Sequence, residues 1–137
     1  MRDQYAGDVS DLLKLAFLRV LAANDRTLGV GWYYNGEPDG RHQDGRHREY
    51  CDEPKWNAVD VALVTALKEL RDLPECSVKA LEELPVWPLK TRFHRTPMPS
   101  AGNRQLWADD MRCTLREARI IFLDPDNALG GPSRKHL

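Results

Sequence analysis

The chain lacks paired cysteines and long hydrophobic runs. Its three cysteines, Cys51, Cys76 and Cys113, lie far apart and form no C-x-x-C pair. This spacing indicates neither a disulfide framework nor a zinc knuckle, and it favours reduced, buried thiols. No stretch has the length and apolarity of a signal peptide or a membrane span. We therefore expect a soluble, cytoplasmic protein without a membrane partner.

The chain also lacks an excess of charge of one sign. Its 20 Lys and Arg residues nearly balance 21 Asp and Glu residues, for a formal net charge of −1. Such a balance gives no global attraction to nucleic acid or to an anionic membrane. A length of 137 residues suits one domain with a single core. We expect one domain over 1–137, with a long loop at 35–50 and a proline-rich link at 96–103.

Hydrophobic periodicity predicts helices that alternate with strands. Asp8 precedes the first helical pattern and can cap it, because its carboxylate can accept the free amides of the first turn; Asn103 stands in the same place before the last helical pattern. The expected helices are 8–22, 56–73, 77–84 and 104–118, and the expected strands are 27–34, 90–94 and 119–125. In the first helix, the residues expected on one buried face are Val9, Leu12, Leu13, Ala16, Phe17, Val20 and Leu21.

Strands separated by helices predict an α/β fold with a mainly parallel sheet. The apolar run 120–123 is typical of a central strand that is covered on both faces. Asp124 follows this run directly. In parallel sheets, ligands bind at the carboxyl ends of the strands, so Asp124 is a candidate site residue.

The stretch Asp124-Pro125-Asp126-Asn127 has three interpretations. Aspartate, asparagine and proline are common turn residues, so the stretch can simply end the strand. Two carboxylates one residue apart can also hold Mg²⁺ or Mn²⁺ for phosphate or nucleic-acid chemistry. Finally, amino-methyltransferases carry an acidic motif, usually Asp-Pro-Pro-Tyr, whose side-chain and backbone oxygens hold the acceptor amine toward the methyl donor.

The third interpretation gains weight from the start of the chain. "YAGDVSDLLKLAFLRVL" resembles the N-terminus of the large-subunit ribosomal RNA adenine-N6 methyltransferase family, which also ends a later strand with Asp-Pro-Pro-Tyr. The whole chain is still more similar to a little-characterised bacterial and phage family with GDxxDxxK and FLDPDNG motifs. The matching pieces include Gly7, Asp8, Asp11 and Lys14, then "LGVGWY", "DGR", "EY" and "FLDPDN".

This resemblance implies a Rossmann-like, methyltransferase-like domain that uses S-adenosylmethionine. Gly7, Asp8 and Lys14 would then lie at the cofactor, and Asp124 to Asn127 would form the catalytic turn. The substrate implied is an amine of a nucleic acid, or another nucleotide-type ligand. Asp126 stands where the methyltransferase motif has its second proline, and Asn127 stands where it has the aromatic residue.

A sheet of this class normally continues with further strands after the motif strand, whereas only "GGPSRKHL" follows here. We therefore expect a C-terminally truncated sheet whose unpaired edge can support a homo-oligomer. A non-catalytic interaction module, or a remnant of an enzyme, is the corresponding third hypothesis for function.

Overall fold

The structure is a computed structural model that describes residues 1–37 and 47–125. Within these ranges, no helix is both long and apolar enough to cross a lipid bilayer. The helices are α1 (Val9–Leu21), α2 (Val61–Arg71), α3 (Val78–Glu82) and α4 (Arg104–Leu115), and the strands are β1 (Leu28–Trp32), β2 (Arg92–His94) and β3 (Ile120–Asp124). Short 3₁₀ helices are η1 (Asp3–Tyr5), η2 (Glu49–Asp52), η3 (Pro54–Ala58) and η4 (Ala101–Asn103).

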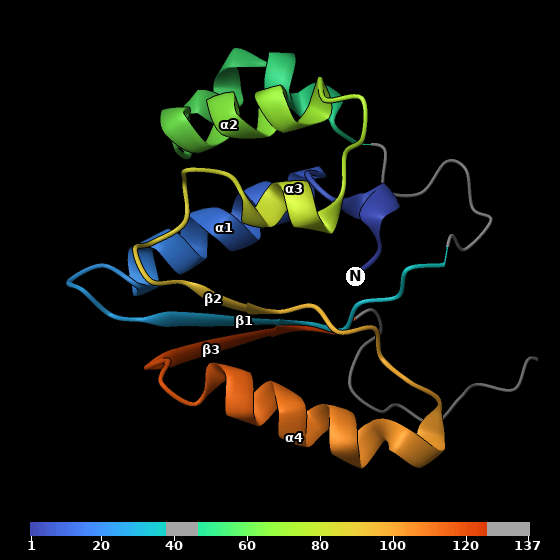
Figure 1. Cartoon of the computed structure of the whole chain (residues 1–137). Helices are drawn as coiled ribbons and strands as arrows, with labels where there is room; N and C mark the ends of the chain where they lie inside the picture. Colours follow the sequence, from blue (N-terminus) through green and yellow to red (C-terminus); the bar gives the residue numbers. More distant parts are fainter. Residues whose placement is uncertain (38–46, 126–137) are drawn as a thin grey trace, which may run out of the picture.

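The three strands form a parallel sheet in the order β2-β1-β3. In Figure 1, α1 and α3 lie on one face of the sheet, α2 packs outside them, and α4 covers the other face. The expected α/β fold with a parallel sheet is thus confirmed. The position expected for the last strand is wrong: among the described residues β1 is the central strand, and β3 pairs on one side only.

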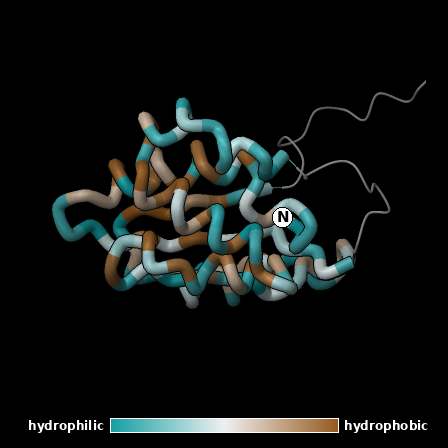
Figure 2. Tube along the Cα trace, turned by 90° about the horizontal axis from the view of Figure 1, so that it is seen from above, coloured by the Kyte–Doolittle hydropathy of each residue, from teal (hydrophilic) through white to brown (hydrophobic). Residues whose placement is uncertain are grey.

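Two apolar clusters flank the sheet. The larger includes the sheet, α1, α2 and α3, and the smaller consists of Trp107, Met111 and Leu115 on α4. In Figure 2, hydrophobic segments run through the middle of the molecule, while the turn between α1 and β1 is hydrophilic. Apolar packing by these two clusters therefore stabilises both faces of the sheet near β1.

Helix α1 buries a face that matches the expected one only in part, at Leu12 and at the partly buried Val9 and Ala16. Its buried apolar residues are Leu12, Leu15 and Leu18. Leu13, Phe17 and Val20, which we expected in the core, are exposed. Both sets recur at helical spacing, and periodicity alone does not tell which of two apolar stripes meets the sheet.

Helix starts follow the capping rules in part. The Asp8 side chain accepts hydrogen bonds from the backbone of Ser10 and Asp11, as expected of an N-cap. Asn103 makes no such side-chain bond, because α4 continues directly from η4. Helix α2 is shorter than expected: its N-cap is Asp60, and the residues before it form η3.

The two predicted connections are described to different extents. Residues 38–46 of the predicted loop lie outside the described residues. The link 96–103 is held by two long-range bonds: the Met98 amide donates to the Tyr34 carbonyl at 2.9 Å, and Trp107 Nε1 donates to the Thr96 carbonyl at 2.8 Å. All three cysteines are free, but only Cys51 is fully buried and Cys113 is exposed, so the expected burial is wrong for Cys113.

The glycines of β1 let α4 approach the sheet closely. A Cβ added at Gly29 would lie 2.9 Å from the Ala118 Cβ. That Cβ is fixed to the backbone, so it cannot move aside by changing rotamer. We expect Gly29→Ala to lower the free energy of unfolding by about 1–3 kcal/mol in urea denaturation, the usual cost of overpacking. The control is Gly102→Ala, since a Cβ there meets nothing within 4 Å. Equal midpoints for both variants would contradict the close packing.

Candidate functional site

The chain changes direction within the sheet between β1 and β3. From β1 it passes through α2 and α3 to β2 on one side, and through α4 it then returns to β3 on the other side. Asp124 and Trp32 are the last residues of β3 and β1 and stand side by side in register. Ligands of open α/β sheets bind where the strand order reverses in this way, outside the carboxyl ends of the strands.

At this end of the sheet, Lys14 of α1 connects two carboxylates. Lys14 Nζ lies 2.8 Å from Asp124 Oδ1 and 3.4 Å from Asp11 Oδ1. The side chain of Asp11 is 1% exposed and that of Asp124 is 11% exposed, whereas Lys14 is 30% exposed. We call these three residues the Asp11–Lys14–Asp124 cluster. It places one cation between two nearly buried anions, and its lysine reaches solvent.

The turn before α1 fixes the position of Asp11. The Gly7 amide donates to Asp11 Oδ2 at 2.9 Å, and the Tyr50 hydroxyl donates to the Gly7 carbonyl at 3.1 Å. Gly7 has a φ of +78°, a conformation that favours glycine. A Cβ there would also come within 3.1 Å of the Leu70 side chain. The Gly7-Asp8 pair is therefore explained by local structure: the first residue makes the turn and the second caps the helix.

Burial gives the cluster unusual protonation behaviour. Removal from water raises the pKa of Asp11 from 3.8 to about 7, although Lys14 pulls it down. Burial alone would lower the pKa of Lys14, but Asp11 and Asp124 outweigh burial and raise it. The lysine is therefore charged at neutral pH, while Asp11 lies near its midpoint. Once Asp11 ionises, the cluster holds two negative charges against one positive charge.

The structure brings together most of the predicted site residues. Gly7, Asp8 and Lys14 lie at the start of α1, Lys14 contacts Asp124, and the half-buried Pro125 follows Asp124. Asp126 and Asn127 lie outside the described residues. Asp8 Oδ1 already accepts bonds from the Ser10 amide, the Ser10 hydroxyl and the Asp11 amide, so its carboxylate serves the helix.

Asp11 is the site residue that the sequence interpretation did not single out. It appeared only as one of the residues that match the resemblance motif. The signal that could have identified it is an acidic residue directly before two leucines, one helical turn before Lys14 on the same helix. An acidic side chain on the core-facing part of a helix needs a partner, because an isolated buried charge is costly.

The aromatic residues that follow β1 pack within the fold. Tyr33 packs edge to face with Trp107, with ring centroids 5.1 Å apart. The Tyr34 hydroxyl donates to Asp3 Oδ2 at 2.8 Å, and the guanidinium of Arg95 lies over the Tyr34 ring. These contacts account for both tyrosines without a bound base.

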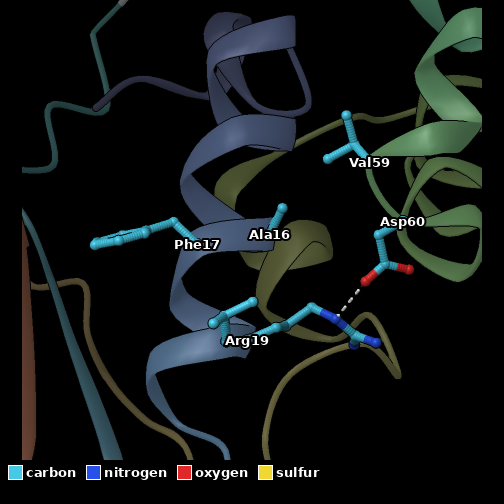
Figure 3. A pocket seen from close by; sticks show the side chains of 6 residues that line it. Ala16, Phe17, Arg19, Val59 and Asp60 are labelled. Carbon is cyan, nitrogen blue, oxygen red and sulfur yellow. Dashed lines mark hydrogen bonds and ion pairs between the residues drawn. The ribbon is translucent and has the colours of Figure 1, made fainter.

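A separate open hollow of about 430 Å³ lies between α1 and the start of α2. Figure 3 shows Arg19 paired with Asp60 at its side, at an Nε to Oδ2 distance of 2.9 Å, and Phe17 projecting away from Val59 and Asp60. Arg19 also donates to the Val86 carbonyl. The charged pair is thus used to join α1 to the neighbouring elements. None of the predicted site residues lines this hollow, which is otherwise mainly apolar.

The alternative of a divalent-metal site stays a prediction, because Asp126 is outside the described residues. Among the residues that are described, no group of three or more His, Cys, Asp or Glu side chains could hold a metal ion. The ammonium of Lys14 lies 2.8 Å from Asp124. A divalent cation on the same carboxylate would be repelled by this charge. Lys14 and a divalent cation would therefore compete for the Asp124 carboxylate.

Comparisons with protein-family models, with curated proteins and with solved structures gave no match to this chain.

Proposed function

We propose that the chain is a Rossmann-like, methyltransferase-like domain that binds a nucleotide-type ligand beside the Asp11–Lys14–Asp124 cluster, with S-adenosylmethionine as its cofactor. The observation that carries the proposal is the contact between Lys14 and Asp124 at the point where the strand order reverses. The resemblance motifs lie at the two ends of the described chain, and the fold brings them within hydrogen-bonding distance. That position is where parallel α/β sheets bind nucleotides.

The charge of the cluster selects the kind of ligand. The Asp11 side chain is 1% exposed and its pKa is raised to about 7, so a buried carboxyl group is kept near neutrality at a cost in stability. Perturbed carboxylates of this kind concentrate at functional sites. A second cation near Asp11 and Asp124 would balance both carboxylates. The sulfonium of S-adenosylmethionine supplies such a positive charge together with the transferable methyl group.

The residues of the chain have distinct parts in this proposal. Lys14 Nζ lies between the carboxyl groups of Asp11 and Asp124 and contacts both. A carboxylate accepts more than one donor, so Asp124 can receive an acceptor amine in addition to Lys14. Pro125 restricts the backbone that follows Asp124. Positioning the amine in this way is the contribution expected of the motif, since methyl transfer needs an aligned lone pair.

Calorimetric titration at pH 8 tests the proposal. We expect S-adenosylmethionine to bind about tenfold more tightly than its demethylated product, about 1.4 kcal/mol, because only the former carries the sulfonium charge. Asp124→Asn should remove most of this preference. The matched control is Asp109→Asn on the exposed surface of α4, which should leave it unchanged. No heat from either compound with the folded wild-type protein would contradict the cofactor assignment.

A further inference from the structure

The outer edge of β3 is ready to accept another strand. In the part of the chain that the structure describes, β3 pairs only with β1. The Ile120 amide donates to the Thr27 carbonyl and the Asp124 carbonyl accepts from the Tyr33 amide, so the alternate residues 120, 122 and 124 face β1. The backbone groups of Ile121 and Leu123 consequently point outward. Protein edges are usually blunted by lysine or proline; β3 itself reads IIFLD, and a proline, Pro125, follows only after its last residue.

Apolar side chains flank this edge on both faces of the sheet. Ile121 and Leu123 are 52% and 44% exposed on the α4 face, because α4 packs mainly over β1 and β2. On the other face, Leu13, Phe17 and Val20 form a stripe along α1 and are 52%, 61% and 74% exposed. Their spacing of four and three residues is that of a helix-packing seam. An occupant of this edge must therefore supply a strand and, above it, an apolar helix.

We propose that this occupant is a second copy of the chain, whose β3 pairs antiparallel with β3 around a two-fold axis at Phe122. Such pairing places Ile121 opposite Leu123 of the second copy, and Leu123 opposite Ile121 of the second copy. These two residues carry the outward backbone groups. The residues that form the antiparallel hydrogen bonds are therefore the same ones that form the apolar cross-strand pairs. The edge is thus complementary to itself, as an isologous dimer requires.

Charge agrees with this register. Arg119 immediately precedes β3, and Asp124 ends it. Antiparallel pairing about Phe122 places Arg119 opposite Pro125 of the second copy's strand, so like charges do not face each other. A parallel arrangement would instead place like charges side by side. The formal net charge of −1 adds little repulsion between two copies.

The same axis also joins the two α1 stripes. Helix α1 packs with β1 in the larger apolar cluster and reaches β3 through Lys14, so it lies over these two strands. With strands about 4.8 Å apart, the helix of the second copy would lie about 10 Å away, a normal distance for packed helices. A two-fold axis perpendicular to the sheet keeps both helices on one face and makes them antiparallel. Phe17 then meets Phe17, and Leu13 meets Val20.

Analytical ultracentrifugation at protein concentrations of roughly 1 to 100 μM tests the dimer. Interfaces of standard size that bind with micromolar affinity assemble in this concentration range. We expect a monomer–dimer equilibrium for the wild-type chain. Ile121→Lys should give a monomer, because it places a charge on the paired edge. Val20→Glu should do the same from the helix side without touching β3. The control is Leu106→Lys on α4, which is 72% exposed and away from the edge.

Cross-linking tests the register. In a Cys113→Ser background, Phe17→Cys should form a disulfide-linked dimer under mild oxidation, while Leu106→Cys should not. Circular dichroism confirms that each variant is folded. A wild-type monomer throughout the concentration range would overturn the proposal, and so would a dimer that survives both Ile121→Lys and Val20→Glu.

Discussion

Replacing Lys14 with methionine should destabilise the protein by about 2 kcal/mol at pH 8 and by less than about 1 kcal/mol at pH 5. At pH 8 the variant leaves Asp11 and Asp124 facing each other without a cation, and removal of one partner of a fully buried ion pair costs about 3–5 kcal/mol. We expect less because the Lys14 side chain is 30% exposed. At pH 5, Asp11 is protonated in the wild-type protein, so only the contact with Asp124 is lost.

Urea denaturation of both proteins at the two pH values measures this difference. Lys79→Met is the matched control, since Lys79 forms an exposed pair with Glu83 at 3.9 Å. Exposed pairs contribute little to stability. We expect the control to be nearly neutral at both values. A Lys14→Met effect that is the same at pH 5 and pH 8 would contradict the shared role of the lysine.

Replacing Asp11 with asparagine should stabilise the protein at pH 8 by about 3 kcal/mol and leave its stability at pH 4 nearly unchanged. Burial raises the pKa of Asp11 to about 7 in the folded state, against an ordinary value of 3.8 for an aspartate in water. Between these values the folded state binds more protons than the unfolded state. Stability from this group is therefore complete below about pH 4 and is lost as the pH rises toward 7. Asparagine cannot ionise, and its side-chain oxygen can still accept the Gly7 amide.

The pH dependence of thermal and urea unfolding tests this prediction. The wild-type protein should lose stability between about pH 4 and pH 7 relative to the Asp11→Asn variant. Asp109→Asn, on the surface of α4, should follow the wild-type curve. Parallel curves for wild type and Asp11→Asn would contradict a raised pKa. A more stable variant that binds S-adenosylmethionine less well would show that the acid is kept for function at a cost in stability.

The parallel α/β arrangement could be predicted because strands and helices alternate in the sequence with clear periods. The place of β3 in the sheet could not. Its apolar run 120–123 is equally suited to a covered central strand and to an edge whose neighbour comes from another chain. Helix α1 posed the same difficulty, because it carries one apolar stripe for the core and a second, at Leu13, Phe17 and Val20, that is exposed.

The site could be predicted in outline from two local signals. Asp124 ends an apolar strand, and Lys14 interrupts an apolar helix, so both were recognisable as polar residues at the border of the core. Their contact depends on the direction of α1 relative to β3, which no local pattern fixes. Asp11 was missed because an acidic residue in the first turn of a helix has an ordinary explanation in the helix dipole. Only its burial in the fold separates it from that role.

The most direct test of the Asp11–Lys14–Asp124 cluster as a ligand site is ¹³C NMR of its two aspartate carboxyl groups, titrated with and without S-adenosylmethionine. In the free protein, Asp11 should titrate near pH 7. Added S-adenosylmethionine should shift the signals of both carboxyls and lower the midpoint of Asp11, because a bound cation favours its ionised form. An Asp11 midpoint near the ordinary value of about 4, with no response of either carboxyl to the ligand, would contradict the site.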